Sequence, residues 1–460
     1  MRNVEDLLRQ IPHVDKLMKN EIIAGSGVYR HEAADAVRSY LAELRDSLIK
    51  GEADSVPEEN EIAARAVELA KSHANRGVSK VINGTGVILH SNLGRACLSK
   101  KASQAAYEAA ASYCTLEYDV ENGSRGSRTA CIEDYLRHIT GCDASMIVNN
   151  NAAAVLLILT AIAKGGNVVV SRGELVEIGG GFRIPEIMAL SGCELREVGT
   201  TNKTRLSDYR DAIDGETRAL LKVHASNFKI IGFSEAVALK DIAELGKSLG
   251  IPVIEDTGSG ALTELKRYNI YNEPFAAESL KNGADIVSFS ADKLLGGPQC
   301  GIILGNGTYI TAMKKHPLYR ALRTDKITIA ALEATLRVYA DPIAAEREIP
   351  VLSMLSLTED TLKSRAESLC EEIRRRGGNA DAVRTNSVAG GGAIPGTELD
   401  SYAITLSGGK SAAEYEQMLR RQPVPIIGHI DEGKLLLDVR TIFEEDFDYI
   451  VSAVVAVSRT

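Results

Sequence analysis

Hydrophobic and polar positions follow three successive patterns along this chain of 460 residues. Up to residue 75 the apolar residues recur at intervals of three and four, as at Ala33, Val37 and Leu44, and glycines or prolines separate the runs. This spacing places the apolar side chains on one face of each helix. Residues 1–75 are therefore predicted to form a helical N-terminal domain.

Residues 76–340 carry a different pattern, in which short runs of valine and isoleucine alternate with alanine-rich helical stretches. The runs lie at residues 146–148, 168–170, 219–223, 253–254 and 286–287, each followed by a polar or glycine-rich turn. Such alternation is typical of βαβ units. It predicts a large α/β domain, with a mostly parallel sheet sandwiched by helices and a ligand at the carboxyl ends of the strands.

Residues 341–460 mix helical and strand patterns, which predict a small C-terminal α+β domain. Helical spacing covers Leu355–Arg376, Ser411–Arg421 and Asp446–Val457. Two short apolar runs, Ile426–Ile427 and Leu435–Val439, flank turn residues at 431–433 and predict a hairpin.

Composition narrows the class of protein. Hydrophobic residues make up 45% and charged residues 25% of the chain, as in ordinary globular proteins, and a formal net charge of -9 disfavours general binding of DNA. The longest apolar runs are too short to span a bilayer and no signal-peptide pattern opens the chain, so we expect a cytoplasmic protein. Seven cysteines without a C-x-x-C pair favour reduced thiols over disulfides or a zinc site.

One lysine, Lys293, is notable for its position. It follows the apolar residues 284–289, which predict a buried strand, and it precedes the glycine pair at 296–297. Loss of hydration there would lower the pKa of the lysine, which an amine needs in order to form a Schiff base with an aldehyde. On this stretch alone, a surface lysine in a turn is an equally good interpretation.

Polar or small residues also stand at the other predicted strand ends. These candidates are Asn150, Asn151, Ala152, Ser226, Asn227, Asp256 and Asp292. The asparagines open a helix, whose free backbone N–H groups favour a phosphate, although a plain asparagine cap is the alternative. Asp256 follows its strand directly, and strand alternation turns Glu255 to the opposite face. A helix cap or a turn is the alternative role for Asp256.

This combination fits pyridoxal 5'-phosphate. That cofactor needs an anion site for its phosphate, a carboxylate that keeps its ring nitrogen protonated, and a lysine for its aldehyde. Asp256 is the best carboxylate and Lys293 the lysine. We therefore predict a pyridoxal-phosphate site at these strand ends, and no metal site.

Arginines form a second feature. They lie in polar or turn-like surroundings at Arg95, at Ser124–Arg128, and at Arg320 and Arg323. The guanidinium fork suits phosphates and other oxyanions. One such motif is usually a surface turn, but three in a chain with a phosphate cofactor predict a substrate that carries its own phosphate.

Long motifs of the chain resemble the bacterial L-seryl-tRNA(Sec) selenium transferases, also called selenocysteine synthases. The motifs are Ile11–Lys16, Asn83–Arg95, Ser171–Gly180, Ser288–Gly301, Pro317–Lys326 and Pro423–Gly428. The chain departs from the family at Ala291, Thr257 and Cys300, where glycine, leucine and alanine are common, and none of these changes removes a reacting group.

The resemblance implies a fold-type I pyridoxal-phosphate enzyme, of the aspartate-aminotransferase fold class, with the cofactor on Lys293. It implies that L-seryl-tRNA(Sec) is dehydrated to an aminoacrylyl intermediate, and that selenium from selenophosphate then gives L-selenocysteinyl-tRNA(Sec). It places Arg95, Arg320 and Arg323 at selenophosphate and the tRNA on residues 1–75. It further implies a homo-oligomer, with dimers gathered into a decameric ring.

Two other functions remain open at this point. A related pyridoxal-phosphate lyase, acting on a small amino acid or amino sugar without tRNA, would need the same central motifs. A catalytically silent scaffold or RNA-binding relative is disfavoured because Lys293 and Asp256 are both present. The helical residues 1–75 favour the tRNA-dependent enzyme, although a solvated helix face also explains their charges.

Overall fold

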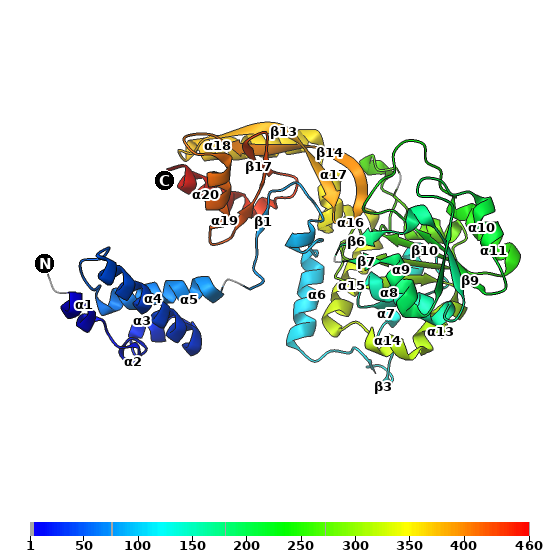
Figure 1. Cartoon of the computed structure of the whole chain (residues 1–460), viewed down its shortest axis with the longest axis horizontal. Helices are drawn as coiled ribbons and strands as arrows, with labels where there is room; N and C mark the ends of the chain where they lie inside the picture. The colour runs from blue at the N-terminus through cyan, green and yellow to red at the C-terminus, as the bar shows by residue number, and fades with distance from the viewer. Residues whose placement is uncertain (1–3, 75–76, 180, 272, 460) are drawn as a thin grey trace. The chain divides into compact units, whose positions relative to one another are not determined.

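The computed structural model describes residues 4–74, 77–179, 181–271 and 273–459. The expected domain boundary at 75 and 76, and the last residue of the motif at 171–180, lie outside this range. The chain divides into two compact units, Met1–Val81 and Ile82–Thr460, whose elements are labelled in Figure 1.

The N-terminal unit is helical, as predicted. Its helices are α1 (Val4–Gln10), α2 (Val14–Leu17), α3 (Glu21–Ala24), α4 (Arg30–Lys50) and α5 (Glu59–Ala74). One set of apolar positions on α4 and α5, among them Val37, Leu41 and Ile62, is buried in one core. Burial of one stripe on each helix explains the three- and four-residue spacing in the sequence.

The second unit is built on a seven-stranded sheet with strand order β4-β12-β11-β10-β9-β5-β8. The strands are β4 (Ala144–Val148), β5 (Asn167–Ser171), β8 (Glu194–Val198), β9 (Thr217–Val223), β10 (Val253–Gly258), β11 (Ile286–Ser290) and β12 (Gly301–Gly305). Only β12 runs antiparallel to its neighbours, so the prediction of a mostly parallel sheet is confirmed. The sequence patterns identified neither β8 nor β12.

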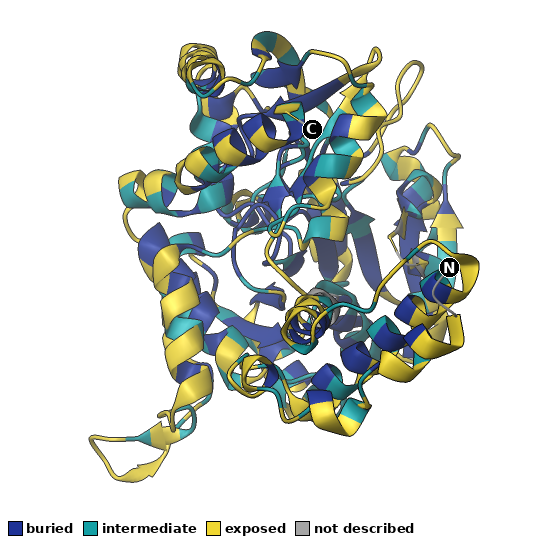
Figure 2. Cartoon of the chain, turned by 90° about the vertical axis from the view of Figure 1, so that its left-hand side faces the viewer, coloured by how far each residue is buried: buried dark blue, intermediate teal, exposed yellow. Residues whose placement is uncertain are grey.

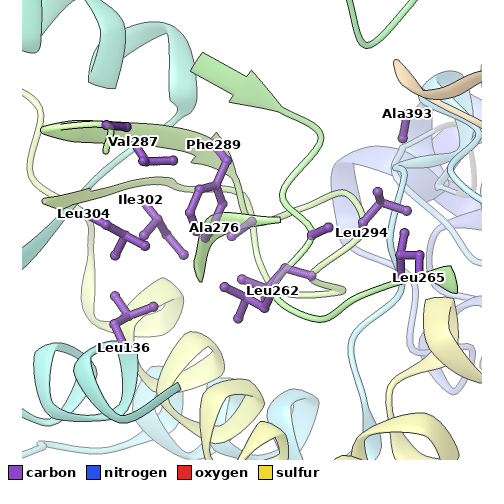
Figure 3. Packing of buried hydrophobic residues seen from close by; sticks show 14 of the residues in the cluster. Leu136, Leu262, Leu265, Ala276, Val287, Phe289, Leu294, Ile302, Leu304 and Ala393 are labelled. Atoms are coloured by element: carbon purple, nitrogen blue, oxygen red, sulfur yellow. The ribbon is translucent and has the colours of Figure 1, made fainter. Parts of the chain in front are cut away.

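Helices cover both faces of this sheet. One face packs against α8 (Asn151–Ile162), α9 (Ile184–Ser191) and α13 (Gly307–Lys315). The other packs against α7 (Ala130–Thr140), α10 (Leu206–Ala212), α11 (Leu239–Leu249), α12 (Ala276–Lys281) and α15 (Lys326–Tyr339). Burial on both faces, visible in Figure 2, explains why these strands read as continuous apolar runs. In Figure 3, Val287, Ile302 and Leu304 gather on the side of Leu136 from α7.

The C-terminal part of this unit carries a second, antiparallel sheet of strand order β13-β14-β17-β16. Its strands are β13 (Ala380–Gly390), β14 (Ala393–Leu406), β16 (His429–Asp431) and β17 (Lys434–Asp438). Its helices are α16 (Pro342–Glu348), α17 (Pro350–Ser356), α18 (Glu359–Arg375), α19 (Ala412–Arg420) and α20 (Phe447–Arg459). The α+β character of this region was predicted.

Two details of that region were predicted wrongly. The run Ile426–Ile427 (β15) pairs in parallel with Ile82–Asn83 (β1), and β16 is the hairpin partner of β17. Leu355 belongs to α17, because the chain leaves the helical conformation between Ser356 and Glu359, where Thr358 caps α18. The long β13–β14 hairpin, drawn beside α18 in Figure 1, was not predicted.

The remaining elements are short connections around the large sheet. They are α6 (Lys100–Ala111), α14 (Pro317–Ala321), and the small pairs β2 (Tyr118–Asp119) with β3 (Ser124–Arg125) and β6 (Glu177–Ile178) with β7 (Phe182–Arg183). No helix within the described parts of the chain is long and apolar enough to cross a membrane. All seven cysteines are free thiols.

Candidate active site

Lys293 lies in the connection between β11 and β12 and is 3% exposed. Backbone hydrogen bonds fix this connection, from Leu294 N to Ser259 O (3.0 Å) and from Gly297 N to Ala291 O (2.9 Å). Gly296 has φ +72, a left-handed conformation that favours glycine, and a Cβ there would lie 2.4 Å from Ile349 Cγ2. The glycine pair after the lysine is therefore required by a close turn.

Burial changes the protonation of this amine. Loss of hydration lowers the pKa of Lys293, and the positive charge of Arg95 lowers it further, against the opposing charges of Asp256, Asp292 and Glu273. The Nζ atom donates a hydrogen bond to Gly392 O over 3.1 Å. A neutral, oriented amine is what attack on a carbonyl requires.

Asp256 lies within β10 and not beyond it, and is 2% exposed. Its Oδ1 accepts hydrogen bonds from Asn151 Nδ2 (2.8 Å) and Ser288 Oγ (3.2 Å). Loss of hydration raises the pKa of Asp256, while the bond from Asn151 and the charge of Lys293 act in the opposite direction. The strand neighbour Glu255 lies beside Lys222 of β9.

The three consecutive asparagines have separate tasks. Asn150 caps α8, since its Oδ1 accepts from Ala153 N at 2.8 Å, so the cap that the sequence left as an alternative is present. Asn151 holds Asp256, and its own Oδ1 has no partner among the described residues. Asn149 N donates to Leu322 O (3.0 Å). Ala152 lies in the first turn, where α8 presents backbone N–H groups.

Ser226 and Asn227 follow β9 near the same strand ends. Ser226 is 2% exposed, and a Cβ at Gly258 would lie 3.3 Å from its Oγ, so it borders the end of β10. Asn227 donates from Nδ2 to Glu177 O at 2.8 Å. A Cβ at Gly392 would meet both Lys293 Nζ (3.3 Å) and Asn227 Cβ (3.8 Å).

The turn Gly390–Gly392, which joins β13 to β14 and contacts Lys293 through Gly392 O, was not predicted from the sequence. All three glycines have positive φ, of 69, 61 and 75 degrees. A Cβ at Gly390 or Gly391 would come within 2.3 Å of Val87 or Leu89. Three adjacent glycines are a visible signal for such a turn, but nothing in the sequence said that it would reach Lys293.

A cavity of about 660 Å³ lies beside these residues. Its lining includes His224, Glu255, Glu273 and Ile394. Glu273 contributes to the charge around Lys293, and its Oε1 has no hydrogen-bond partner in the described chain. The charged residues of the cavity lining have both signs, since Lys203 and Lys222 lie there together with the carboxylates.

Arg95 lies close to the lysine and has φ +63, in the left-handed region. Its Nη1 lies 2.7 Å from Oδ2 of Asp292, the residue that precedes Lys293. Asp292 O also accepts from Ala96 N at 3.3 Å. Arg95 and Asp292 thus form a partly buried ion pair beside Lys293, which is why Arg95 affects the pKa of that lysine.

The other two arginines of the expected donor site lie around α14. Arg320 is exposed, while Arg323 is partly buried with its Nη1 3.7 Å from Glu117 Oε1. The bond from Asn149 N to Leu322 O places this segment beside the start of α8. Arg95 and Arg323 have different carboxylate partners, Asp292 for Arg95 and Glu117 for Arg323.

The residues present fit pyridoxal phosphate. Lys293 supplies a buried amine and Asp256 an acceptor held by two donors, and the first turn of α8 supplies N–H groups. Asn151 Oδ1 remains without a donor. A buried polar atom without a partner is expected where a bound group would complete it.

Fold and site together define a fold-type I pyridoxal-phosphate enzyme. D-glucosaminate-6-phosphate ammonia-lyase is a solved structure of similar fold, with a TM-score of 0.58 and 20% identity over 84% of this chain and 98% of that one. The family model for L-seryl-tRNA selenium transferase matches residues 81–443. The chain belongs to that family.

Named relatives of this family align over almost the whole chain. L-seryl-tRNA(Sec) selenium transferase of Alkaliphilus metalliredigens is 46% identical over 98% of this chain and 99% of its own. The protein of that name from Geobacter sulfurreducens is 44% identical over 97% and 98%. The similarity to the ammonia-lyase, at 20% identity, concerns the fold alone and gives no support to a small-molecule lyase.

Proposed function

We propose that this protein converts L-seryl-tRNA(Sec) to L-selenocysteinyl-tRNA(Sec), with pyridoxal phosphate on Lys293 and selenophosphate as the selenium donor. The observation that carries the proposal is the buried amine of Lys293 between Asp256 and the Arg95–Asp292 ion pair. An amine and a carboxylate serve the cofactor, and an arginine beside them serves an anionic second substrate.

The cofactor, when bound, withdraws electrons from the α-carbon of the seryl group, so that the α-proton and then the β-hydroxyl group can leave. Lys293 Nζ takes the α-proton, and Gly392 O is the acceptor that orients the resulting ammonium group. Asp256, itself held by Asn151, would be the acceptor for the protonated ring nitrogen. Asn150, Ala152, Ser226 and Asn227 line the cofactor's binding site.

Arg95, Arg320 and Arg323 bind the phosphate group of selenophosphate. Selenium forms a bond to the β-carbon as its bond to phosphorus breaks, and the Lys293 ammonium group returns a proton to the α-carbon. A water oxygen takes the place of selenium on phosphorus to give inorganic phosphate. Asp292 orients Arg95 for this role through the 2.7 Å ion pair. The exposed Arg320 can reach an incoming anion without first losing a protein partner.

The remaining expectations concern larger partners. We place the tRNA on the helical residues 1–75, the cofactor domain at 76–340 and a small domain at 341–460. The protein assembles as dimers gathered into a decameric ring and acts in the cytoplasm. The placement of the tRNA is supported by the N-terminal unit, because residues 1–81 form a separate compact unit with its own core, as a dedicated binding domain would.

The visible spectrum of the purified holoenzyme tests this proposal. We expect absorbance from the lysine-bound cofactor that changes when seryl-tRNA(Sec) is added without selenophosphate, and that does not change with free serine or bulk seryl-tRNA. A coloured protein that ignores seryl-tRNA(Sec) would contradict the tRNA substrate. A protein without colour, even after cofactor is added, would contradict the role of Lys293.

A further inference from the structure

A second group of arginines lies around one carboxylate, Glu117, next to the proposed donor site. Arg128 contacts Glu117 Oε1 through Nε (2.9 Å) and Nη2 (2.7 Å), and Arg125 contacts Oε2 through Nη2 (2.8 Å). Arg323 is the third, with its Nη1 3.7 Å from Oε1. Glu117 is thus a carboxylate with three guanidinium groups around it, and guanidinium groups are the donors that suit tetrahedral oxyanions.

The three arginines differ in how many of their donors are used. Arg128 is committed, because its Nη1 also donates to Thr324 O (2.9 Å). Arg323 is not, because its Nε is buried and has no acceptor among the described residues. A buried donor without a partner is costly. Arg323 therefore presents one edge toward Glu117 and keeps another for an acceptor that comes from outside.

We propose that Glu117 is a positioning residue of the donor site: it holds Arg128 and Arg323 in place, and as an internal anion it limits how tightly Arg323 holds phosphate. This inference rests on the proposed function, which puts Arg323 at selenophosphate. Transfer of selenium leaves inorganic phosphate among the arginines, where a fixed negative charge a few ångströms away repels it. The carboxylate thereby favours release of this product and the next turnover.

The test compares Glu117→Gln with Glu117→Asp in the full-length holoenzyme, with inorganic phosphate as the probe. Loss of the charge in Glu117→Gln removes a repulsion at short range and should tighten phosphate binding about tenfold. Glu117→Asp keeps the charge and should bind phosphate as the wild type does. Phosphate should become a stronger inhibitor of Glu117→Gln, whose multiple-turnover rate falls while its single-turnover rate is kept.

Glu333→Gln is the matched control, because it removes a glutamate from one exposed ion pair with Arg337 on α15 and should change neither quantity. A merely structural role for Glu117 would weaken phosphate binding on its removal, so unchanged or weaker binding by Glu117→Gln overturns the inference. Equal tightening in Glu117→Asp overturns it as well. If the Arg323→Ala variant binds phosphate as tightly as the wild type does, Arg323 is not part of the donor site. That result contradicts the proposed function and not the role of Glu117.

Discussion

The lysine site and the arginine group around Glu117 use charge in opposite ways. Lys293 and Asp256 are 3% and 2% exposed, and burial shifts both pKa values toward the neutral form. Glu117 keeps 27% of its side chain exposed, and its bonds from Arg128 and Arg125 lower its pKa, so it stays ionised. The amine that must lose its proton is therefore buried, and the Glu117 carboxylate stays near water. Asp256 is buried although its role needs the ionised form, which the bonds from Asn151 and Ser288 and the charge of Lys293 favour.

Arg95 joins the two kinds of region. It belongs with the arginines proposed for the donor, yet it pairs with Asp292 and its charge lowers the pKa of Lys293. The cation that we propose for the second substrate therefore also lowers the pKa of the lysine. Substitutions can test the lysine site, the arginines, and Arg95 as the residue that connects them.

Lys293→Ala should have the largest effect. Without the amine the cofactor has no covalent attachment and the α-proton no base, so turnover should fall by about a thousandfold or more. Lys293→Arg keeps the positive charge and should be equally inactive, because a guanidinium group stays protonated. The measurement is formation of selenocysteinyl-tRNA. Turnover retained by either variant would refute the assignment of Lys293.

Asp256→Asn should have the second largest effect on turnover. The amide cannot stabilise a protonated ring nitrogen, so turnover should fall by about a hundredfold, the scale of a lost buried charge partner in a reaction site. The cofactor should still attach to Lys293, which separates this variant from Lys293→Ala in the visible spectrum. Full activity of Asp256→Asn would show that another group faces the ring nitrogen.

Arg320→Ala tests the arginine side. It removes a charged contact to the donor, so the KM for selenophosphate should rise about tenfold, while the spectral change with seryl-tRNA(Sec) alone is unaffected. Arg347→Ala, an exposed arginine paired with Glu348 on α16, is the control and should alter neither. Equal loss of both steps in Arg320→Ala would contradict a role confined to the donor.

The pH dependence of cofactor loading tests the link at Arg95. Attack on the aldehyde needs the neutral amine, so the rate of cofactor loading should rise with pH. Because burial lowers the pKa of Lys293, that rate should level off at a pH below the pKa of a free lysine. Arg95→Met removes a charge that lowers this pKa and frees Asp292, which raises it. The plateau should therefore move to higher pH. No movement would mean that burial alone sets the protonation of Lys293.

The buried lysine at a strand end was easier to predict from the sequence than the arginine group around Glu117. An apolar strand with a lysine at its end is a local signal, and so is helical spacing such as that of Val37 and Leu41. The contact of Arg323 with Glu117 joins positions some two hundred residues apart, which no local pattern records. The β13–β14 hairpin escaped prediction because polar residues interrupt it: Arg384 and Asn386 are exposed, and Thr385 is only partly buried.

Ser288→Ala is the smallest test and concerns the hydrogen bonds that keep Asp256 in place. Ser288 Oγ donates to Asp256 Oδ1 at 3.2 Å in a fully buried position. Its loss should lower the free energy of unfolding by about 1 kcal/mol. Because that bond lowers the pKa of Asp256, the deficit should be larger at high pH and shrink as the carboxylate takes up a proton.

Ser145→Ala on β4 is the matched control for Ser288→Ala. Ser145 is equally buried, but its Oγ has no partner among the described residues, so removing that hydroxyl group deletes the same atom without breaking a hydrogen bond. Urea unfolding of the cofactor-free protein at several pH values measures both variants. If they lose the same stability at every pH, packing explains the contribution of Ser288, and its bond to Asp256 does not.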